Sequence, residues 1–264
     1  MISIIIPFRD KIDLLRQCVF SVLEKTIYDD YEIILVNNQS KEYKTKAFLG
    51  EIEDNSKIRI LNYDKVFNFS AINNFAVKEA QGEFILFLNN DTEVISPNWL
   101  GKMLNCLEGE QVGVVGAELF YPDDTVQHVG VMLEKERLAI HAFRKWKEDD
   151  INLDNPREWM AVTAACMLTK KELFLKIGGF NEVNLAIAYN DIDYCLKVRK
   201  LGYKIICVPD AKLYHHESAS RKSDIFAKFF NRKRYKQFIM EQEYMRKKWA
   251  KEIADDHFYD KKNI

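Results

Sequence analysis

The segment Phe84-Ile-Leu-Phe-Leu88, followed directly by Asn89-Asn-Asp-Thr-Glu93, decides the fold of this chain. Five successive apolar residues predict a strand that is covered on both faces, as the strands of parallel α/β sheets are. The run ends abruptly in side chains that carry oxygen atoms. Because ligands of open parallel sheets lie beyond the carboxyl ends of the strands, this junction is the first place where we expect a functional site.

The chain around this segment alternates between short apolar runs and helical patterns. A helix is predicted over 71–80, with Ser70 as a possible N-cap, and another is predicted to begin at Ser96-Pro97, with Pro in its first turn. The predicted strands of this half are 2–7, 32–37, 57–62, 83–88 and 112–119. Strands that alternate with helices predict an α/β fold with a Rossmann-like, mostly parallel central sheet and flanking helices.

Beyond about residue 120 the pattern changes to short strands broken by polar loops. The acid-rich stretch 146–156 is expected to be mobile, and glycines are expected to close two helices at 178–179 and 202. Strands are predicted over 161–169, 204–209 and 211–215, and helices over 170–177 and 190–201. The last forty residues predict one long helix with a common apolar face made by Phe226, Phe230, Phe238, Met245 and Trp249.

The composition excludes several classes of protein. With 264 residues, 47% hydrophobic and 30% charged, the chain can bury a full-sized core and is not disordered. No apolar run exceeds five residues, so we expect neither a transmembrane helix nor a signal peptide. The five cysteines are widely spaced within apolar segments, which indicates reduced core residues of a cytosolic protein. A formal net charge of −1 argues against a nucleic-acid partner.

Polar side chains at the ends of the predicted strands are the candidates for chemistry. Asp91 could hold a divalent cation against a diphosphate, or it could turn the chain or cap the next helix. His215, at the end of the last strand, could be a metal ligand or an ordinary surface or core histidine. Asp191 and Asp193 open a helix, where the helix dipole favours acids for structural reasons alone.

Nine short motifs occur in order along residues 1–221. They are Ser3-Ile-Ile-Ile-Pro7, Glu32-Ile-Ile-Leu-Val-Asn-Asn-Gln-Ser40, Asn68-Phe-Ser-Ala-Ile-Asn-Asn74, Gly82-Glu-Phe-Ile-Leu-Phe-Leu-Asn-Asn-Asp-Thr-Glu93, Val112-Gly-Val-Val-Gly116, Gln127-His-Val-Gly130, Gly178-Gly-Phe180, Asn190-Asp-Ile-Asp-Tyr-Cys-Leu-Lys197 and Leu213-Tyr-His-His-Glu-Ser218. In this ordered set the chain resembles the family 2 glycosyltransferases of the GT-A fold. The resemblance is to the bacterial group that builds O-antigens, capsules and related surface glycans.

The resemblance implies an inverting transfer of a sugar from a nucleotide diphosphate donor, of the UDP or dTDP type, to a hydroxyl of a glycan or lipid-linked acceptor. It implies that Asp91 binds Mg²⁺ or Mn²⁺ and that Asn89 stands where relatives carry a first acid. His215 matches the late histidine of the family and would be the second metal ligand, in preference to His216. Asp191 would be the general base, with Asp193 as the alternative base or an orienting residue.

The same resemblance implies the residues that hold the donor. The nucleotide pocket would begin at Pro7, Phe8 and Arg9, and Asn37 would contact the base. Asn68, Asn73 and Asn74 occupy the donor-binding positions, although turn or cap roles are equally open to them. Asn89 and Asn90 complete the candidate set.

Three segments are expected: a nucleotide-sugar-binding half over 1–119, an acceptor and catalytic half over 120–221, and a basic amphipathic helix over 222–264. Between Arg221 and Lys251 eleven Lys or Arg face three acids, a local net charge of +8. This excess would hold a cytoplasmic enzyme at the anionic inner membrane face, or the helix simply packs on the catalytic domain. Because asparagine replaces acids at 37, 89 and 190, a non-catalytic sugar-nucleotide or glycan-binding domain is the rival hypothesis. A dinucleotide-dependent oxidoreductase is disfavoured, since no GxGxxG follows the first strand.

Overall fold

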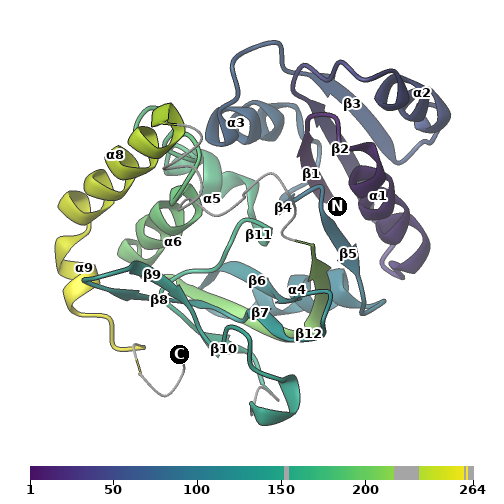
Figure 1. Cartoon of the computed structure of the whole chain (residues 1–264). Helices are drawn as coiled ribbons and strands as arrows, with labels where there is room; N and C mark the ends of the chain where they lie inside the picture. Colours follow the sequence, from purple (N-terminus) through teal and green to yellow (C-terminus); the bar gives the residue numbers. More distant parts are fainter. Residues whose placement is uncertain (152–154, 217–231, 259, 261–264) are drawn as a thin grey trace.

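The N-terminal half of the computed structural model alternates strands and helices as the sequence predicts. The structure describes residues 1–151, 155–216, 232–258 and 260 (Figure 1). The elements of this half are β1 (Ile2–Phe8), α1 (Ile12–Lys25), β2 (Tyr31–Asn37), α2 (Tyr43–Ile52), β3 (Ile58–Asn62), α3 (Phe69–Glu79), β4 (Phe84–Leu88), β5 (Thr92–Val94), α4 (Trp99–Leu107) and β6 (Val112–Phe120). Each predicted strand of this half is confirmed to within one residue at either end.

The C-terminal half contributes shorter elements. They are β7 (Val126–His128), β8 (Val131–Glu134), β9 (Leu138–His141), the 3-10 helix η1 (Glu148–Asp150), β10 (Arg157–Glu158), β11 (Cys166–Lys170), α5 (Lys171–Lys176), α6 (Asn190–Lys200), β12 (Lys204–His215), α8 (Arg232–Lys248) and α9 (Ala250–Ala254). Gly178, Gly179 and Gly202 adopt positive φ just after α5 and α6, which confirms their predicted role as helix ends.

The central sheet is mixed rather than wholly parallel. Its strand order is β10-β12-β6-β11-β4-β1-β2-β3, with β5 paired to β12 and β7 to β6. The pairs β1–β2, β1–β4, β2–β3 and β6–β12 are parallel. Strand β11 runs antiparallel between β4 and β6, so it joins the two parallel parts of the sheet.

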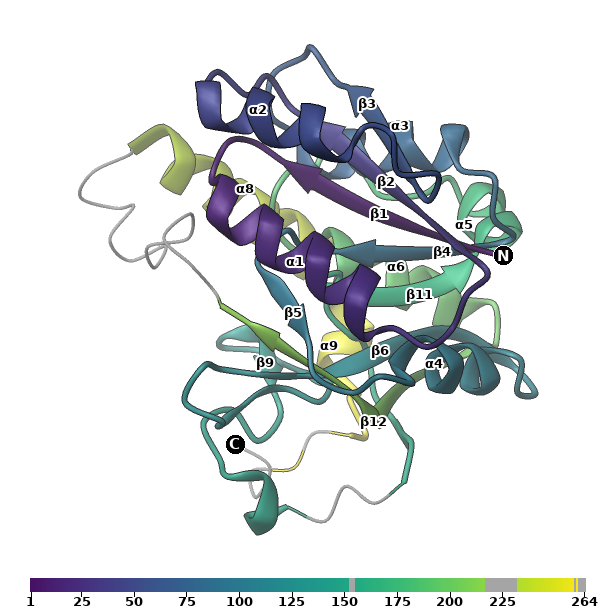
Figure 2. The same cartoon turned by 90° about the vertical axis from the view of Figure 1, so that its right-hand side faces the viewer.

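Both faces of the sheet are covered, and alternate residues of each strand enter two different cores. Phe84, Leu86 and Leu88 of β4 belong to a cluster with α1, α2 and α4, whereas Ile85 and Phe87 belong to a cluster with α3, α5 and α6. Figures 1 and 2 show these helices on opposite sides of the strands. The prediction of a strand buried on both faces is therefore confirmed.

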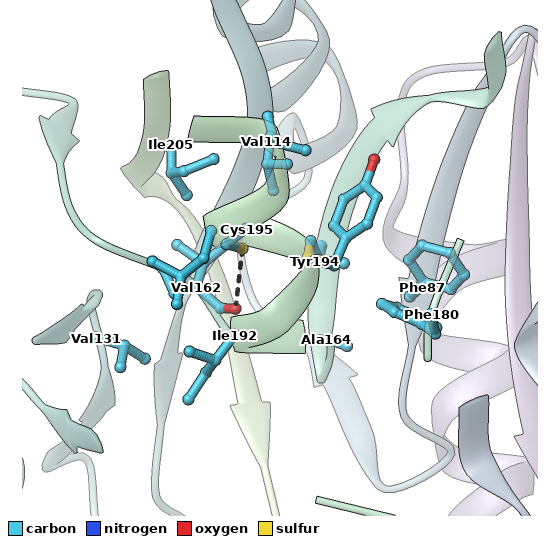
Figure 3. Close-up of a cluster of buried hydrophobic side chains, with 14 of the residues drawn as sticks. Phe87, Val114, Val131, Val162, Ala164, Phe180, Ile192, Tyr194, Cys195 and Ile205 are labelled. Carbon is cyan, nitrogen blue, oxygen red and sulfur yellow. Dashed lines mark hydrogen bonds between the residues drawn. The ribbon is translucent and has the colours of Figure 1, made fainter. Parts of the chain in front are cut away.

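Aromatic rings fill the second cluster beneath α6. The ring centroids of Phe87 and Phe180 are 4.8 Å apart, and Tyr194 of α6 packs against Phe180 (Figure 3). The thiol of Cys195 donates to the carbonyl oxygen of Val162 at 3.8 Å. This packing holds the middle of α6 against the sheet.

Two predicted helix starts are wrong by a few residues. Helix α3 begins at Phe69, and its N-cap is Asn68 rather than Ser70, because the Asn68 side chain accepts from the Ala71 N–H at 2.9 Å. Helix α4 begins at Trp99 with Asn98 as N-cap, so Pro97 precedes the helix instead of occupying its first turn.

Three boundaries in the second half also differ. Strand β11 begins only at Cys166, because 161–165 pass along the cavity described below and form just an isolated bridge at Ala161. The two strands predicted over 204–215 are one, β12, whose register against β6 shifts between Val208 and Lys212. The stretch expected to be mobile contains η1, and Glu148 forms an ion pair with Lys212; residues 152–154 lie outside the described residues.

The C-terminal segment packs on the same side of the sheet as α6. Met245, Trp249 and Ile253 are buried in the same cluster as α6, which confirms the predicted packing for Met245 and Trp249. Within residues 232–258 the chain forms two helices, α8 and α9, whereas the sequence predicts one continuous helix there. Phe226 and Phe230 lie outside the described residues.

All five cysteines are free. Within the part of the chain that the structure describes, no helix has the length and apolar character needed to cross a bilayer.

Candidate functional site

A cavity of about 600 Å³ opens where β4, β12, the β8–β9 hairpin, α6 and α8 meet. Acidic, imidazole, amide and guanidinium side chains line it together with aromatic and aliphatic side chains. Among the predicted site residues, Asn89, Asp91, Asp191 and His215 line this cavity. The structure therefore brings together residues that are up to 126 positions apart in the sequence.

Asp91 lies in the tight turn between β4 and β5. Strand β4 is fully buried, and the Thr92 N–H donates back to the Asn89 carbonyl at 3.3 Å. The chain then enters β5, which pairs antiparallel with the end of β12. Asp91 is 7% exposed, so its carboxylate is held at the base of the cavity rather than on the surface.

His215 reaches Asp91 from the end of β12. Strand pairing places His215 opposite Thr92, and its Nε2 lies 3.2 Å from Asp91 Oδ1 and 3.3 Å from Asn89 Nδ2. The neighbouring His216 does not line the cavity, and its Nε2 lies 3.5 Å from Glu93 Oε2. Of the two histidines, only His215 shares a site with Asp91.

Gln127 is a site residue that sequence reasoning missed. It is 4% exposed, and its Oε1 accepts from His215 Nδ1 at 2.5 Å while its Nε2 donates to the His215 carbonyl at 3.0 Å. Because an amide oxygen only accepts, Nδ1 carries the hydrogen in this contact, and Nε2 is the ring nitrogen that faces Asp91. The only sequence signal was its place in the Gln127-His-Val-Gly130 motif.

A second missed feature is the histidine pair beside Gln127. His141 lines the cavity, and its Nδ1 lies 3.1 Å from the Gln127 carbonyl oxygen. The His128 ring packs edge-on against His141 with centroids 4.8 Å apart, and burial holds the pKa of His128 well below its usual range. His128 is therefore neutral, and its Nε2 accepts from the Thr163 N–H at 3.4 Å, which supports the cavity wall.

Asp191 occupies the first turn of α6 and faces the cavity. Its Oδ2 accepts from the Ala164 N–H at 3.0 Å, and its Oδ1 accepts from the Ile192 N–H at 2.9 Å. Tyr189, the N-cap, adopts a left-handed conformation with φ of 60° and turns the chain into the helix. Two backbone donors thus fix the carboxylate in one orientation while it remains partly exposed.

Asp193 is placed very differently from Asp191. It is fully buried, does not line the cavity, and its Oδ1 accepts from Lys248 Nζ at 2.6 Å and from Trp249 Nε1 at 2.8 Å. Its Oδ2 pairs with Lys197 Nζ at 3.0 Å. Asp193 thus connects the C-terminal helices to α6, whereas Asp191 faces the cavity; the alternative role of Asp193 as the base stays a prediction.

The residues expected at the start of the nucleotide pocket lie at neighbouring strand ends but outside the cavity. Phe8 pairs in register with Asn37 across β1 and β2, and Phe8 is buried in the core, so it has no surface to offer a ligand. Pro7 is half-buried and Arg9 exposed. Asn37 donates to Asn62 Oδ1 at 3.1 Å and accepts from the Ser40 N–H.

The three asparagines expected at the donor-binding positions, Asn68, Asn73 and Asn74, form hydrogen bonds within the protein. Asn68 caps α3 and donates to the Glu182 carbonyl at 2.9 Å, and Asn74 exchanges hydrogen bonds with the backbone of Phe180. Asn73 is fully buried and donates to the Phe69 carbonyl. Because these amides bind the protein itself, the structure does not support donor contacts for them. Asn90 is half-buried in the turn and does not line the cavity.

The donor set at Asp91 and His215 fits a divalent cation that shares its shell with a diphosphate. Ligands at right angles around an ion, each about 2.1 Å from it, lie about 3 Å apart, close to the 3.2 Å between Asp91 Oδ1 and His215 Nε2. Within the described ranges, no group of three His, Cys, Asp or Glu side chains could hold a metal ion. A cation here would therefore need phosphate oxygens or water to complete its coordination.

The chain is similar in sequence to glycosyltransferases. The model of the family described as Glycosyl transferase family 2 matches residues 3–178. The chain is 40% identical to the uncharacterized protein y4gI of Sinorhizobium fredii over 264 residues, which cover 98% of the chain and 28% of that relative. It is 40% identical to the O-antigen biosynthesis protein RfbC of Myxococcus xanthus over 228 residues, which cover 84% of the chain and 18% of that relative. The chain thus spans less than a third of either relative.

Two solved structures share the fold. GalNAc-T7 with UDP, GalNAc and Mn²⁺ aligns with a TM-score of 0.69 at 14% identity, covering 81% of this chain and 43% of that one. The mannosyltransferase PcManGT from Pyrobaculum calidifontis, in complex with GDP-Man and Mn²⁺, aligns with a TM-score of 0.66 at 16% identity, covering 96% of this chain and 64% of that one.

Proposed function

The chain belongs to glycosyl transferase family 2, and on that premise we propose that it is a metal-dependent, inverting glycosyltransferase of surface-polysaccharide synthesis. That it is a glycosyltransferase of the GT-A fold, as its motifs imply, is confirmed. The proposal concerns the finer questions: which residues act, on what substrates, and where.

One observation carries the proposal. Asp91 and His215 converge at 3.2 Å, and the carboxylate of Asp191 lines the same cavity. A transferase needs a site that neutralises the leaving diphosphate and, within reach of it, a base for the acceptor hydroxyl. The cavity offers one carboxylate for each task, and Gln127 orients the imidazole that assists the first.

Asp91 and His215 would hold a divalent cation, and the imidazole favours Mn²⁺ over Mg²⁺, which prefers oxygen ligands. Such a cation supplies Lewis-acid stabilisation of the charge on the departing diphosphate. Asn89 contributes a neutral amide where relatives carry an acid, so the protein brings a single negative charge to the site.

Asp191 takes the proton of the acceptor hydroxyl at a carboxylate oxygen. As the hydroxyl oxygen bonds to the anomeric carbon, the bond between that carbon and the diphosphate oxygen breaks. Attack in one step from the face opposite the leaving group inverts the anomeric configuration. The Ala164 and Ile192 N–H groups hold the Asp191 carboxylate so that little reorganisation is needed in the transition state.

We assign the donor to the nucleotide diphosphate sugars, of the UDP or dTDP type, and the acceptor to a glycan or lipid-linked glycan. The name of the Myxococcus xanthus relative supports a role in O-antigen synthesis. Seven Lys or Arg against two Glu within Arg232–Lys248 support a cytoplasmic enzyme that contacts the anionic inner membrane face.

The test is a screen of UDP-, dTDP- and GDP-sugars by thermal shift and by donor hydrolysis, with Mn²⁺, with Mg²⁺ and with EDTA. Wild-type protein is expected to bind and slowly hydrolyse one donor class only with a divalent cation. Asp91→Ala should lose metal-dependent nucleotide binding, whereas Asp191→Asn should keep binding and lose at least a hundredfold in turnover.

Asp54→Asn is the matched control, since Asp54 is exposed and remote from the cavity. Full activity of Asp91→Ala would remove the metal assignment. Binding without turnover in the wild type, for every donor and acceptor mixture, would favour the rival non-catalytic binding domain.

A further inference from the structure

Helix α8 holds the loop that leads into Asp191. Glu241 of α8 is 3% exposed, and its carboxylate accepts from the Ala188 N–H at 2.7 Å and from the Ile187 N–H at 3.2 Å. Gln237, one turn earlier, donates to the same carboxylate at 3.0 Å. A buried carboxylate that accepts two backbone donors fixes the loop, so α8 is part of the wall of the cavity.

The same helix places an aromatic side chain beside the base. The rings of Phe238 and Tyr189 are tilted by 32° with centroids 5.6 Å apart, and both line the cavity. Gln242 Nε2 lies 3.3 Å from the Tyr189 hydroxyl oxygen. Since Tyr189 precedes Asp191 by two residues, this aromatic wall adjoins the carboxylate that would take the acceptor proton.

The two ends of the cavity differ in chemistry. Asp91 and His215 provide charged and coordinating groups at the end formed by β5 and β12, where a diphosphate would be neutralised. In Figure 1, α8 lies on one side of α6, while β5 and β12 lie on the other. From α8, the ring of Phe238 and the polar side chains of Gln237 and Arg234 line the cavity, and Tyr189 at the start of α6 lies beside Phe238.

A pyranose fits such a wall better than a nucleotide phosphate does. One face of a sugar ring presents C–H groups that pack on an aromatic ring, and its hydroxyls hydrogen-bond to polar groups at the edge. A general base must lie within hydrogen-bond reach of the hydroxyl that it deprotonates. The sugar next to Asp191 and away from Asp91 is therefore the acceptor.

We infer that Tyr189 and Phe238, held by Glu241, form an acceptor subsite on which a pyranose ring of the acceptor stacks. This inference rests on the proposed function and deepens it. It assigns a role in acceptor recognition to helix α8.

The experiment is saturation-transfer difference NMR on the full chain. The probes are the methyl α- and β-pyranosides of glucose, galactose, mannose, rhamnose and N-acetylglucosamine, with Mn²⁺ and excess UDP or GDP present to fill the donor site. At least one glycoside is expected to receive saturation on the ring protons of one face. Phe238→Leu keeps an apolar side chain over Tyr189 but no ring, and it should weaken that binding about fivefold or more.

Phe238→Tyr keeps the ring and is expected to bind the glycoside like the wild type. Met240→Ala is the matched control, because Met240 lies on the same helix and is 59% exposed. Melting temperature and Mn²⁺–nucleotide affinity should not change in any of the three variants. The inference is overturned if no glycoside binds the wild type, or if Phe238→Leu binds it with wild-type affinity. Loss of Mn²⁺–nucleotide binding in the wild type would instead refute the proposed function.

Discussion

Replacing Asp193 by Ala separates the anchoring role of this carboxylate from the proposed catalytic role of Asp191. Asp193 is fully buried, accepts hydrogen bonds from Lys248 and the indole N–H of Trp249, and forms an ion pair with Lys197. Removing one partner of a buried ion pair commonly costs about 3 to 5 kcal/mol. Here the two lysines are 31% and 22% exposed, so water can resolvate them and the cost is smaller.

The indole N–H of Trp249 would lose its acceptor in Asp193→Ala, which lowers the free energy of unfolding further. Trp249 is 1% exposed, and losing the acceptor of a buried N–H costs about 1 to 3 kcal/mol. We therefore expect Asp193→Ala to lower the free energy of unfolding by about 2 to 4 kcal/mol, which corresponds to a fall of roughly 5 to 15 °C in melting temperature. Asp193→Asn keeps an oxygen for the indole and should lose less.

The assay combines thermal melting by circular dichroism with donor hydrolysis at a temperature where every variant is folded. Asp193→Asn should retain most of its turnover, whereas Asp191→Asn should melt near the wild type and lose turnover. An Asp193→Ala protein that melts like the wild type would refute the anchoring argument. Collapse of turnover in folded Asp193→Asn, with Asp191→Asn active, would show that the wrong carboxylate has been chosen as the base.

Three further outcomes are expected. Gln127→Leu should weaken Mn²⁺ binding about tenfold or more in calorimetry with nucleotide present, because the His215 ring loses its orienting partner; unchanged affinity would contradict this. Burial, with Glu148 nearby, raises the pKa of Glu118 to about 8. The folded state therefore binds more protons than the unfolded state, and the free energy of unfolding falls as pH rises from about 5 to 8. Glu118→Gln should remove this pH dependence in urea titrations, and a retained pH dependence would contradict the assignment of it to Glu118. The protein should co-sediment with anionic but not neutral vesicles at low salt and detach at high salt. Each basic residue of α8 near the membrane surface adds about 1 kcal/mol to the binding free energy, and salt screens this attraction. Failure to bind either vesicle type at low salt would leave α8 only its packing role.

The N-terminal half was predictable because its signals are local. Runs such as Ile2–Phe8 and Phe84–Leu88 are buried along their length, and the helices between them carry apolar residues at helical spacing. Helix starts were less predictable, because Ser70 and Asn68 are both good caps by residue type. Only the geometry of the turn decides that Asn68 accepts from Ala71.

The fold of the second half depends on strand pairings that the spacing of apolar residues does not determine. The residues of β11 read as a buried strand, yet nothing local indicates that the strand runs antiparallel between β4 and β6. The polar interruption between Val208 and Lys212 reads as a loop between two strands, but the sheet absorbs it as a register shift within β12.

The candidate site was predictable where a residue type and a strand end coincide, as at Asp91 and His215. It was not predictable where a role depends on a distant partner. Asn74 is tied to Phe180, 106 residues away, and Asp193 to Trp249, 56 residues away. A polar side chain in one of these motifs could bind either substrate or another part of the protein. Only the folded structure shows which of the two it contacts.

The replacement of an acid by Asn89 has a consequence for the order of binding in the proposed site. With one carboxylate and one imidazole as ligands, a divalent cation would keep an excess positive charge, so the protein alone would hold it weakly. A diphosphate brings the missing negative charge and oxygen ligands together, which makes cation and donor mutually dependent. Gln127 and the β5–β12 pairing keep Asp91 and His215 3.2 Å apart beforehand, so that the site does not have to be assembled when the donor arrives.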